Sequence, residues 1–283
     1  MPSMFTKAIV RPPAANFSEG LTTAELGVPD YQLALEQHGY YCTALESCGI
    51  ELIRLEPDER YPDSCFVEDA ALIIQQVLKT DEGVRVPGDH SAIITRPGAL
   101  SRRGEVESLR GQFSNLFSTI HEIRAPGTVD GGDVCEAGTH FFIGISERTN
   151  EDGARQLARL LAGSGFTHDV VDIRGISGLL HLKSGLASLG DGTLIVTEAL
   201  ANLKQFRGYN LIRVDAGEEY AANCIEVNGR VLMAAGFPRF EAKLRDELDY
   251  DTVSLDMSEF EKMDGGLSCL SLRWGEKGVD SRQ

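Results

Sequence analysis

Positive charge is scarce in this sequence, which has 27 Lys and Arg residues against 43 Asp and Glu residues and a formal net charge of −16. Binding to nucleic acid requires clustered Lys and Arg side chains that neutralise phosphates. The only adjacent basic pair is Arg102 and Arg103. We therefore expect no nucleic-acid partner, and an acidic field favours a cationic small molecule instead.

Long apolar runs and paired cysteines are also missing. The chain has no run of roughly 18 apolar residues, which a membrane span requires. The opening residues "MPSMFTKAIV" lack the apolar core of a secretion signal. None of the six cysteines lies in a CxxC pair or at zinc-finger spacing from His, and six in 283 residues do not make a disulfide framework. We expect a cytoplasmic protein with reduced thiols, no membrane partner, and no metal or other cofactor.

A repeated pattern is present instead. Each repeat has a short strand-like segment with a polar residue, a turn containing Gly, Asp or Asn, and a second apolar strand. The repeats lie at residues 64–74, 132–145, 180–196, 221–234 and 266–274. Apolar residues at helical spacing predict helices at 30–49, 101–117, 150–165 and 238–248. The pattern predicts an α/β protein with one closed, pseudo-symmetric domain over residues 1–283.

Two predicted helices begin at residues that can act as N-caps, which are Ser101, with Glu105 nearby, and Asn150. Two further segments fall outside the repeats. Residues 75–92 are polar, contain Pro and Gly, and read as a hairpin extension or surface loop. Residues 275–283 read as a solvated tail.

In a closed structure of this kind the inner strands converge on an axis, so polar residues at matching places should meet there. These residues are Glu68, Asp69, Asp133, His181, Asn223 and Cys269. A thiol and a distant imidazole are the usual parts of a cysteine nucleophile, in which the His moves the proton. Taken singly, a buried Cys or His is more often a simple core residue.

Carboxylates are grouped in two short motifs. "PDSCFVEDA" contains Asp63, Glu68 and Asp69, and "TVDGGDV" contains Asp130 and Asp133. Such acids are costly to bury without a partner, although any one of them could serve only as a turn residue. A planar guanidinium that is always charged suits paired carboxylates. A thiolate could then attack its carbon, and an amine would leave with a proton from His.

With these residues in place, the sequence resembles the dimethylarginine dimethylaminohydrolases, hydrolases of the guanidine-modifying superfamily. The resemblance covers nearly the whole chain and rests on "PDSCFVEDAALI", "AIITRPGALSRRGEVE", "APGTVDGGDV", "LHLKSGLASL" and "EKMDGGLSCLSLRW". It implies a five-bladed α/β propeller of ββαβ units. It also implies hydrolysis of Nω-methylated L-arginine to L-citrulline and dimethylamine or methylamine, through a covalent S-alkylthiouronium intermediate.

The resemblance also implies residue roles. Cys269 matches the family's nucleophile, His181 its general acid and base, and Asp130 the acid that orients this chemistry. Glu68 and Asp69 match guanidinium contacts, and Arg102 and Arg148 match the clamp on the α-carboxylate. The other substrate-binding positions that it implies are Leu21, through its carbonyl, Asp63, Met263 and Ser268. Lys183 is given no role.

Three alternatives stay open at this point. An arginine deiminase and an amidinotransferase share the nucleophile and carboxylates, and an arginine-binding protein could use the same fold without catalysis. Deiminases usually carry a helical insertion, for which 283 residues leave little room. The oligomeric state is not fixed by any feature of the sequence, and a homodimer is left open.

Overall fold

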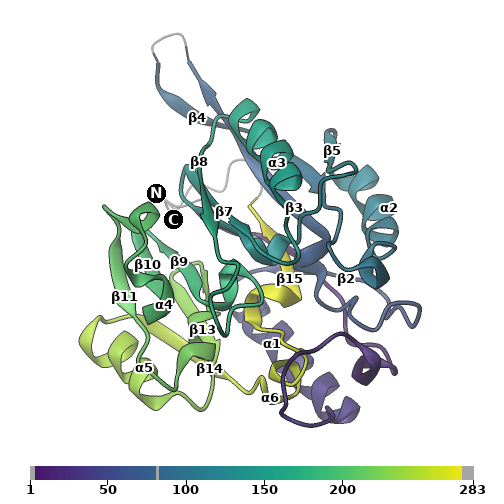
Figure 1. Ribbon diagram of the computed structural model, residues 1–283, viewed down its shortest axis with the longest axis vertical. Helices are drawn as coiled ribbons and strands as arrows, with labels where there is room; N and C mark the ends of the chain where they lie inside the picture. The colour runs from purple at the N-terminus through teal and green to yellow at the C-terminus, as the bar shows by residue number, and fades with distance from the viewer. Residues whose placement is uncertain (1–3, 81–82, 276–283) are drawn as a thin grey trace.

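The computed structural model describes residues 4–80 and 83–275 and has five three-stranded sheets arranged as blades around a centre (Figure 1). In each sheet the inner strand is antiparallel to the middle strand, which is parallel to the outer strand. The predicted α/β propeller of ββαβ units is confirmed.

The chain closes the ring by pairing its two ends. In inner-to-outer order the sheets are β15 (Ser271–Trp274), β1 (Lys7–Val10) and β2 (Glu51–Arg54); β3 (Ala71–Lys79), β4 (Arg85–Ile94) and β5 (Ile120–Glu122); β6 (Val134–Ala137), β7 (His140–Ile145) and β8 (Thr167–Asp172); β9 (Leu186–Gly190), β10 (Thr193–Val196) and β11 (Asn210–Arg213); β12 (Ile225–Val227), β13 (Arg230–Ala234) and β14 (Asp251–Leu255). Because β15 pairs with β1, the last described strand completes the first blade.

Each middle strand is joined to its parallel outer strand by a helical crossover. The crossovers contain α1 (Tyr31–Ser47), α2 (Val106–Leu116), α3 (Glu151–Gly163), α4 (Glu198–Ala201) with η6 (Lys204–Phe206), and α5 (Pro238–Ala242) continued by a π-helical turn, η8 (Lys243–Glu247). Short helical segments also occur at η1 (Phe17–Glu19), η3 (Leu100–Arg102) and α6 (Ser258–Glu261). The four predicted helices are present, and the crossover through α4 was not predicted because it is only about one turn long.

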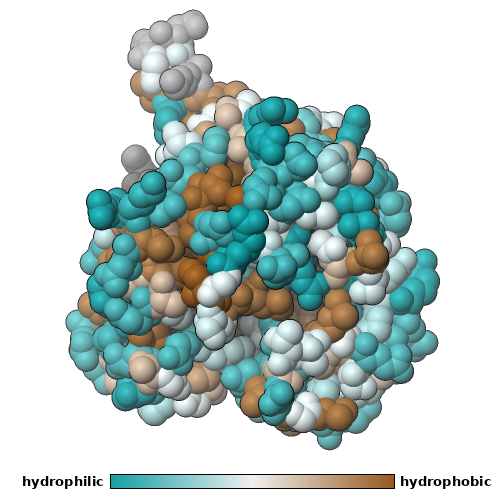
Figure 2. All heavy atoms as spheres, viewed as in Figure 1, coloured by the Kyte–Doolittle hydropathy of each residue, from teal (hydrophilic) through white to brown (hydrophobic). Residues whose placement is uncertain are grey.

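Of the two N-caps predicted from the sequence, one is confirmed and the other is wrong. Asn150 caps α3 by accepting a hydrogen bond from the Gly153 N–H, as expected. Ser101 does not cap α2, because it lies within η3 and the α-helix begins only at Val106. Figure 2 shows hydrophilic side chains over the outer faces of α2 and α3, since each helix buries only the face that covers its sheet.

A short 3-10 turn precedes every inner strand. These turns are η2 (Val67–Ala70), η4 (Gly131–Asp133), η5 (Leu182–Ser184), η7 (Glu219–Ala222) and η9 (Leu267–Leu270). The polar residues at matching places lie in or beside these turns, not within the strands as the sequence suggested. His181, for example, is the N-cap of η5 and lies ahead of β9. The turns contact one another at the centre of the ring and bring these residues together.

Residues 75–80 and 83–92 form most of the described part of the β3–β4 hairpin, which extends away from the body of the molecule in Figure 1. At its base the Val77 N–H donates to the Ser164 carbonyl over 2.8 Å. The pocket described below has no lining residue from this hairpin. The predicted tail at 275–283 lies outside the described residues except for Gly275. Among the described residues, no helix is both long and apolar enough to cross a bilayer.

Candidate active site

A pocket opens at the centre of the ring. Its lining residues are Leu21, Asp63, Phe66, Asp69, Arg102, Arg148, Leu180, His181, Met263, Asp264, Gly265 and Cys269. Most of the residues expected from the resemblance are among them. The exceptions are Asp130, Glu68 and Ser268, which are buried and hydrogen bonded to one another or to neighbours of the pocket.

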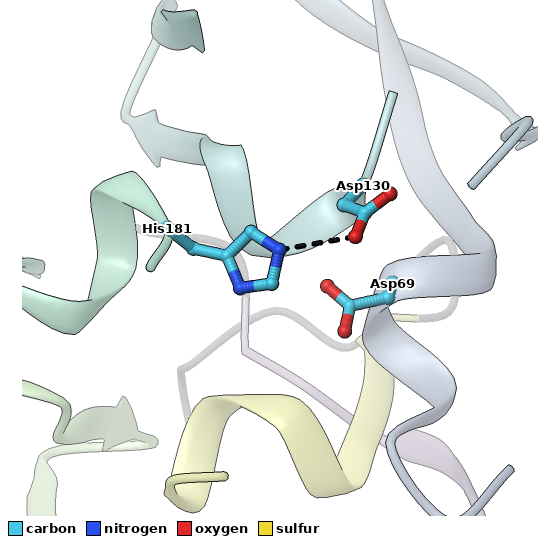
Figure 3. Close-up of side chains that lie close together, drawn as sticks. All are labelled: Asp69, Asp130 and His181. Atoms are coloured by element: carbon cyan, nitrogen blue, oxygen red, sulfur yellow. Dashed lines mark hydrogen bonds and ion pairs between the residues drawn. The ribbon is translucent and has the colours of Figure 1, made fainter. Parts of the chain in front are cut away.

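His181 and Asp130 form a buried ion pair, with 3.0 Å between Nε2 and Oδ2 (Figure 3). Asp130 is completely buried and comes from the residue before η4. Burial alone would lower the pKa of His181, but the carboxylates of Asp69, Asp130 and Asp133 outweigh it and raise that pKa to about 9. The imidazole therefore carries a proton at neutral pH, as a general acid must.

Asp69 faces the same imidazole from η2 (Figure 3). Its Oδ1 accepts from the Gly132 N–H at 2.8 Å, and its Oδ2 accepts from Arg102 Nη1 at 2.6 Å. Burial opposes ionisation, yet His181, Arg102 and the Gly132 amide together lower the pKa of Asp69 below its usual value. Position 132 must be glycine here, because a Cβ would stand 2.9 Å from both Asp69 Oδ1 and His181 Cγ.

The thiol of Cys269 lies in η9, whose turn is closed by a hydrogen bond from the Cys269 N–H to the Gly266 carbonyl. Burial and the nearby carboxylates of Glu68 and Asp69 raise its pKa to about 12, against a smaller opposing effect of Lys183. The thiol is therefore protonated at neutral pH. A cation beside these two carboxylates would cancel their effect and favour the thiolate.

Glu68 lies directly behind the pocket. Its carboxylate is 2.5 Å from Lys183 Nζ and accepts from Ser268 Oγ at 2.8 Å. Burial raises the pKa of Glu68, and Lys183 and Arg273 oppose that shift. Sequence reasoning gave Lys183 no role, although its place two residues after His181 on one short turn was a usable signal.

The two arginines, which the sequence treats alike, differ in their surroundings. Arg102 is 5% exposed and bonds to Asp69 and to Glu105, at 2.8 Å from Nη2 to Oε2 of Glu105. Arg148 also lines the pocket, and no hydrogen bond or ion pair joins its guanidinium to any residue that the structure describes. Arg102 is thus largely occupied by its neighbours, whereas Arg148 offers its donors to the pocket. Glu105, which burial gives a pKa of about 7, was missed by sequence reasoning.

Asp63, Leu21 and Met263 form another part of the pocket lining. The Leu21 N–H donates to Asp63 Oδ1 at 3.0 Å, which leaves the Leu21 carbonyl unused by this pair. Burial raises the pKa of Asp63, and Arg102 opposes that shift. Asp264 ties the Leu21 segment down by accepting from Thr22 Oγ1 at 3.3 Å. An acid and a carbonyl in this part of the lining suit an ammonium group.

One set of groups has the composition of a metal site. Ligand atoms of Asp69, Asp130 and His181 lie within 4.8 Å of one another. Asp69 is already paired with Arg102, and His181 with Asp130. A protonated imidazole cannot bind a metal, so a metal would have to displace the proton that the neighbouring carboxylates stabilise on His181.

A five-bladed α/β propeller with Cys, His and carboxylates at its centre defines a protein of the guanidine-modifying class. No protein-family model matches the chain. The N(G),N(G)-dimethylarginine dimethylaminohydrolase of Pseudomonas aeruginosa is 43% identical over 272 residues, covering 96% of this chain and 100% of that protein. The enzyme of the same name from Streptomyces coelicolor is 36% identical over 282 residues, covering 98% and 99%.

A solved structure shows the same relationship. A cysteine-to-serine variant of the P. aeruginosa enzyme, complexed with citrulline, has a TM-score of 0.85 and 44% identity, and the match covers 96% of this chain and 100% of that one. The chain belongs to the dimethylarginine dimethylaminohydrolase family.

Proposed function

We propose that this protein hydrolyses Nω-methylated L-arginine to L-citrulline and dimethylamine or methylamine. The observation that carries the proposal is the buried set of Cys269, protonated His181 and Asp69 around one pocket, in a chain of this family. The citrulline complex of the P. aeruginosa variant supports it, because citrulline would be the product.

The pocket gives each part of methylarginine a partner of opposite charge. We assign the guanidinium to Asp69, with Glu68 behind it, and the α-ammonium to Asp63 and the Leu21 carbonyl. The free guanidinium of Arg148 suits the α-carboxylate. Arg102 touches the pocket too, but its bonds to Asp69 and Glu105 make holding Asp69 its main task.

The chemistry follows from the raised pKa values of Cys269 and His181. When the cationic substrate enters, the thiol of Cys269 releases its proton to solvent, and the sulfur attacks the guanidinium carbon. The C–N bond to the methylated nitrogen breaks, and the amine leaves with the proton of His181. Water then adds to the S-alkylthiouronium carbon and gives its proton to His181. The C–S bond then breaks, the added hydroxyl loses its remaining proton to solvent as the carbonyl forms, citrulline leaves, and the thiolate is restored.

Two further properties are proposals as well. Residues 1–283 act as one catalytic domain in the cytoplasm, where reducing conditions suit six cysteines that are all free. A homodimer stays a prediction that sedimentation analysis would test.

The decisive test compares substrates and products side by side. Asymmetric dimethylarginine and arginine are incubated with the enzyme at one pH, and citrulline, dimethylamine and ammonia are measured. The methyl-bearing nitrogen lacks donors, so a site that pairs every N–H would reject it. We expect kcat/KM for dimethylarginine to exceed that for arginine at least about tenfold. Preference for arginine would indicate a deiminase, amidino transfer to an amine would indicate a transferase, and binding without turnover would indicate an arginine-binding protein.

A further inference from the structure

The 3-10 turns at the centre are tied together by side chains that accept backbone hydrogen bonds from the next blade. Asp69 Oδ1 accepts from the Gly132 N–H at 2.8 Å, Asp133 Oδ1 from the Leu182 N–H at 2.9 Å, and Asn223 Oδ1 from the Ser268 N–H at 2.9 Å. The three acceptors follow the same pattern in three blades and are each at least nine-tenths buried. Only Asp69 lines the pocket.

We propose that Asn223 is a positioning residue for the nucleophile, holding the turn that carries the Cys269 thiol at a fixed distance from the turn that carries His181. The inference rests on the function proposed above and names a residue for it that touches neither the pocket nor the thiol. Asp133 has the corresponding place beside His181, because it accepts a hydrogen bond from the N–H of Leu182, the residue after His181.

The first argument is that the Asn223 side chain contacts both ends of η9, the turn that carries Cys269. The Asn223 side chain accepts from Ser268, the residue immediately before Cys269. It also packs against Gly266, where a Cβ would lie 2.5 Å from the Asn223 Cγ. Gly266 in turn supplies the carbonyl that accepts from the Cys269 N–H. The close packing explains why position 266 is a glycine, and it leaves the turn little freedom to shift.

The second argument is that one amide spans two catalytic turns. While Oδ1 holds η9, Nδ2 of Asn223 donates to the Lys183 carbonyl at 3.1 Å, and Lys183 lies in η5 beside His181. Lys183 Nζ contacts Glu68, which accepts from Ser268 Oγ. The contacts thus close a ring of four residues, Asn223, Ser268, Glu68 and Lys183, around the base of the thiol.

The third argument is the choice of an amide over an acid. A carboxylate at position 223 could accept from Ser268, but it could not donate to the Lys183 carbonyl. It would also add negative charge near Cys269, where Glu68 and Asp69 already disfavour the thiolate. A neutral side chain with one acceptor and one donor meets both requirements, which explains why Asn223 stands where the equivalent blades have Asp69 and Asp133.

The test compares Asn223→Ala with a matched control, Asn228→Ala. Asn228 also makes interblade hydrogen bonds, accepting from the Phe5 N–H at 2.8 Å and donating to the Phe5 and Cys48 carbonyls, but it lies at the β12–β13 turn and does not line the pocket. For each protein we would measure kcat and KM for dimethylarginine per folded molecule, the Tm, and the rate at which iodoacetamide alkylates Cys269, read by mass spectrometry.

Misplacement of a reacting atom by about 1 Å costs about 100-fold in rate. We therefore expect Asn223→Ala to lower kcat by about 10- to 100-fold with little change in KM, and to change the alkylation rate of Cys269. Asn228→Ala should lower the Tm yet keep kcat and the alkylation rate of the wild type. Equal kcat per folded molecule for all three proteins would overturn the proposal.

Two further readouts keep the outcome interpretable. If Asn223→Ala does not fold, the near-isosteric Asn223→Asp replaces it, and wild-type kcat for that variant would overturn the proposal. If the wild-type protein makes no citrulline, the proposed function fails, but the alkylation rates still test the positioning of Cys269. An alkylation rate that is unchanged in Asn223→Ala and Asn223→Asp would overturn the inference whatever the substrate.

Discussion

Asp130→Asn is expected to lower the pKa of His181 while leaving the shape of the site intact. Asp130 is fully buried, and its Oδ1 accepts from the Gly98 N–H at 2.8 Å, a bond that an asparagine oxygen can keep. Its Oδ2 lies 3.0 Å from His181 Nε2. In the variant an amide donor faces Nε2, which favours the neutral imidazole.

The size of the shift follows from the bond that is lost. A hydrogen bond to a charged group is worth about 1.5–3 kcal/mol, and about 1.4 kcal/mol corresponds to one pKa unit. The pKa of His181, raised to about 9 in the wild type, should therefore fall by about one to two units. The pKa of His181 falls because the carboxylate that is removed stabilises the imidazolium. If His181 protonates the leaving amine, kcat of the variant should decline at a correspondingly lower pH.

Imidazole NMR titration measures this pKa directly, and the spectrum of His181→Gln identifies the resonance among the six His residues. The pH dependence of kcat is recorded in parallel. Asp169→Asn is the control, because it alters a surface pair in which 3.4 Å separates His140 Nε2 from Asp169 Oδ2. A His181 pKa that stays near its wild-type value in Asp130→Asn would refute the reasoning, and Asp69 with Asp133 would then be its main determinants.

Five further outcomes are expected. Cys269→Ser should fold but form no citrulline, because a hydroxyl is far too weak an acid to replace the thiolate; measurable turnover by the folded variant would refute the assignment. Arg148→Ala should raise the Kd for methylarginine by about one to two decades, yet barely affect a methylguanidine that lacks the amino-acid end. Arg102→Ala should instead reduce the free energy of unfolding by about 3–5 kcal/mol in denaturant titrations, because two buried carboxylates lose their partner. The folded-state pKa of His181 is raised from 6.5 to about 9, so its stabilising contribution is full below pH 6.5 and is lost as the pH rises towards 9. The difference in unfolding free energy between wild type and His181→Gln should shrink over that window. Prolonged treatment with a chelator should leave citrulline formation unchanged; loss of activity that a metal restores would show that Asp69, Asp130 and His181 hold an ion.

Much of the architecture could be predicted from local patterns. Alternating apolar residues with Gly, Asp or Asn turns predicted the paired inner and middle strands, and Asn228 indeed adopts a positive φ of 54° in one such turn. Helical spacing gave α1 and α3 with their approximate ends. The start of α2 was misplaced, because the sequence there can form either a 3-10 turn or an α-helix and packing decides between them.

The sequence by itself indicated the residue types of the site, since a thiol at Cys269 and an imidazole at His181 suggested a cysteine nucleophile, and the family resemblance added the role of Asp130. Tertiary structure alone decided how they interact. The pKa of His181 is raised because the carboxylates of Asp69, Asp130 and Asp133 outweigh its burial, and the Cys269 thiol stays protonated because it is buried and lies near Glu68 and Asp69. Arg102 and Arg148 look alike in sequence, but one is buried against Asp69 and Glu105 and the other faces the pocket. Burial and distance between segments far apart in the chain set these properties, and a linear pattern contains neither.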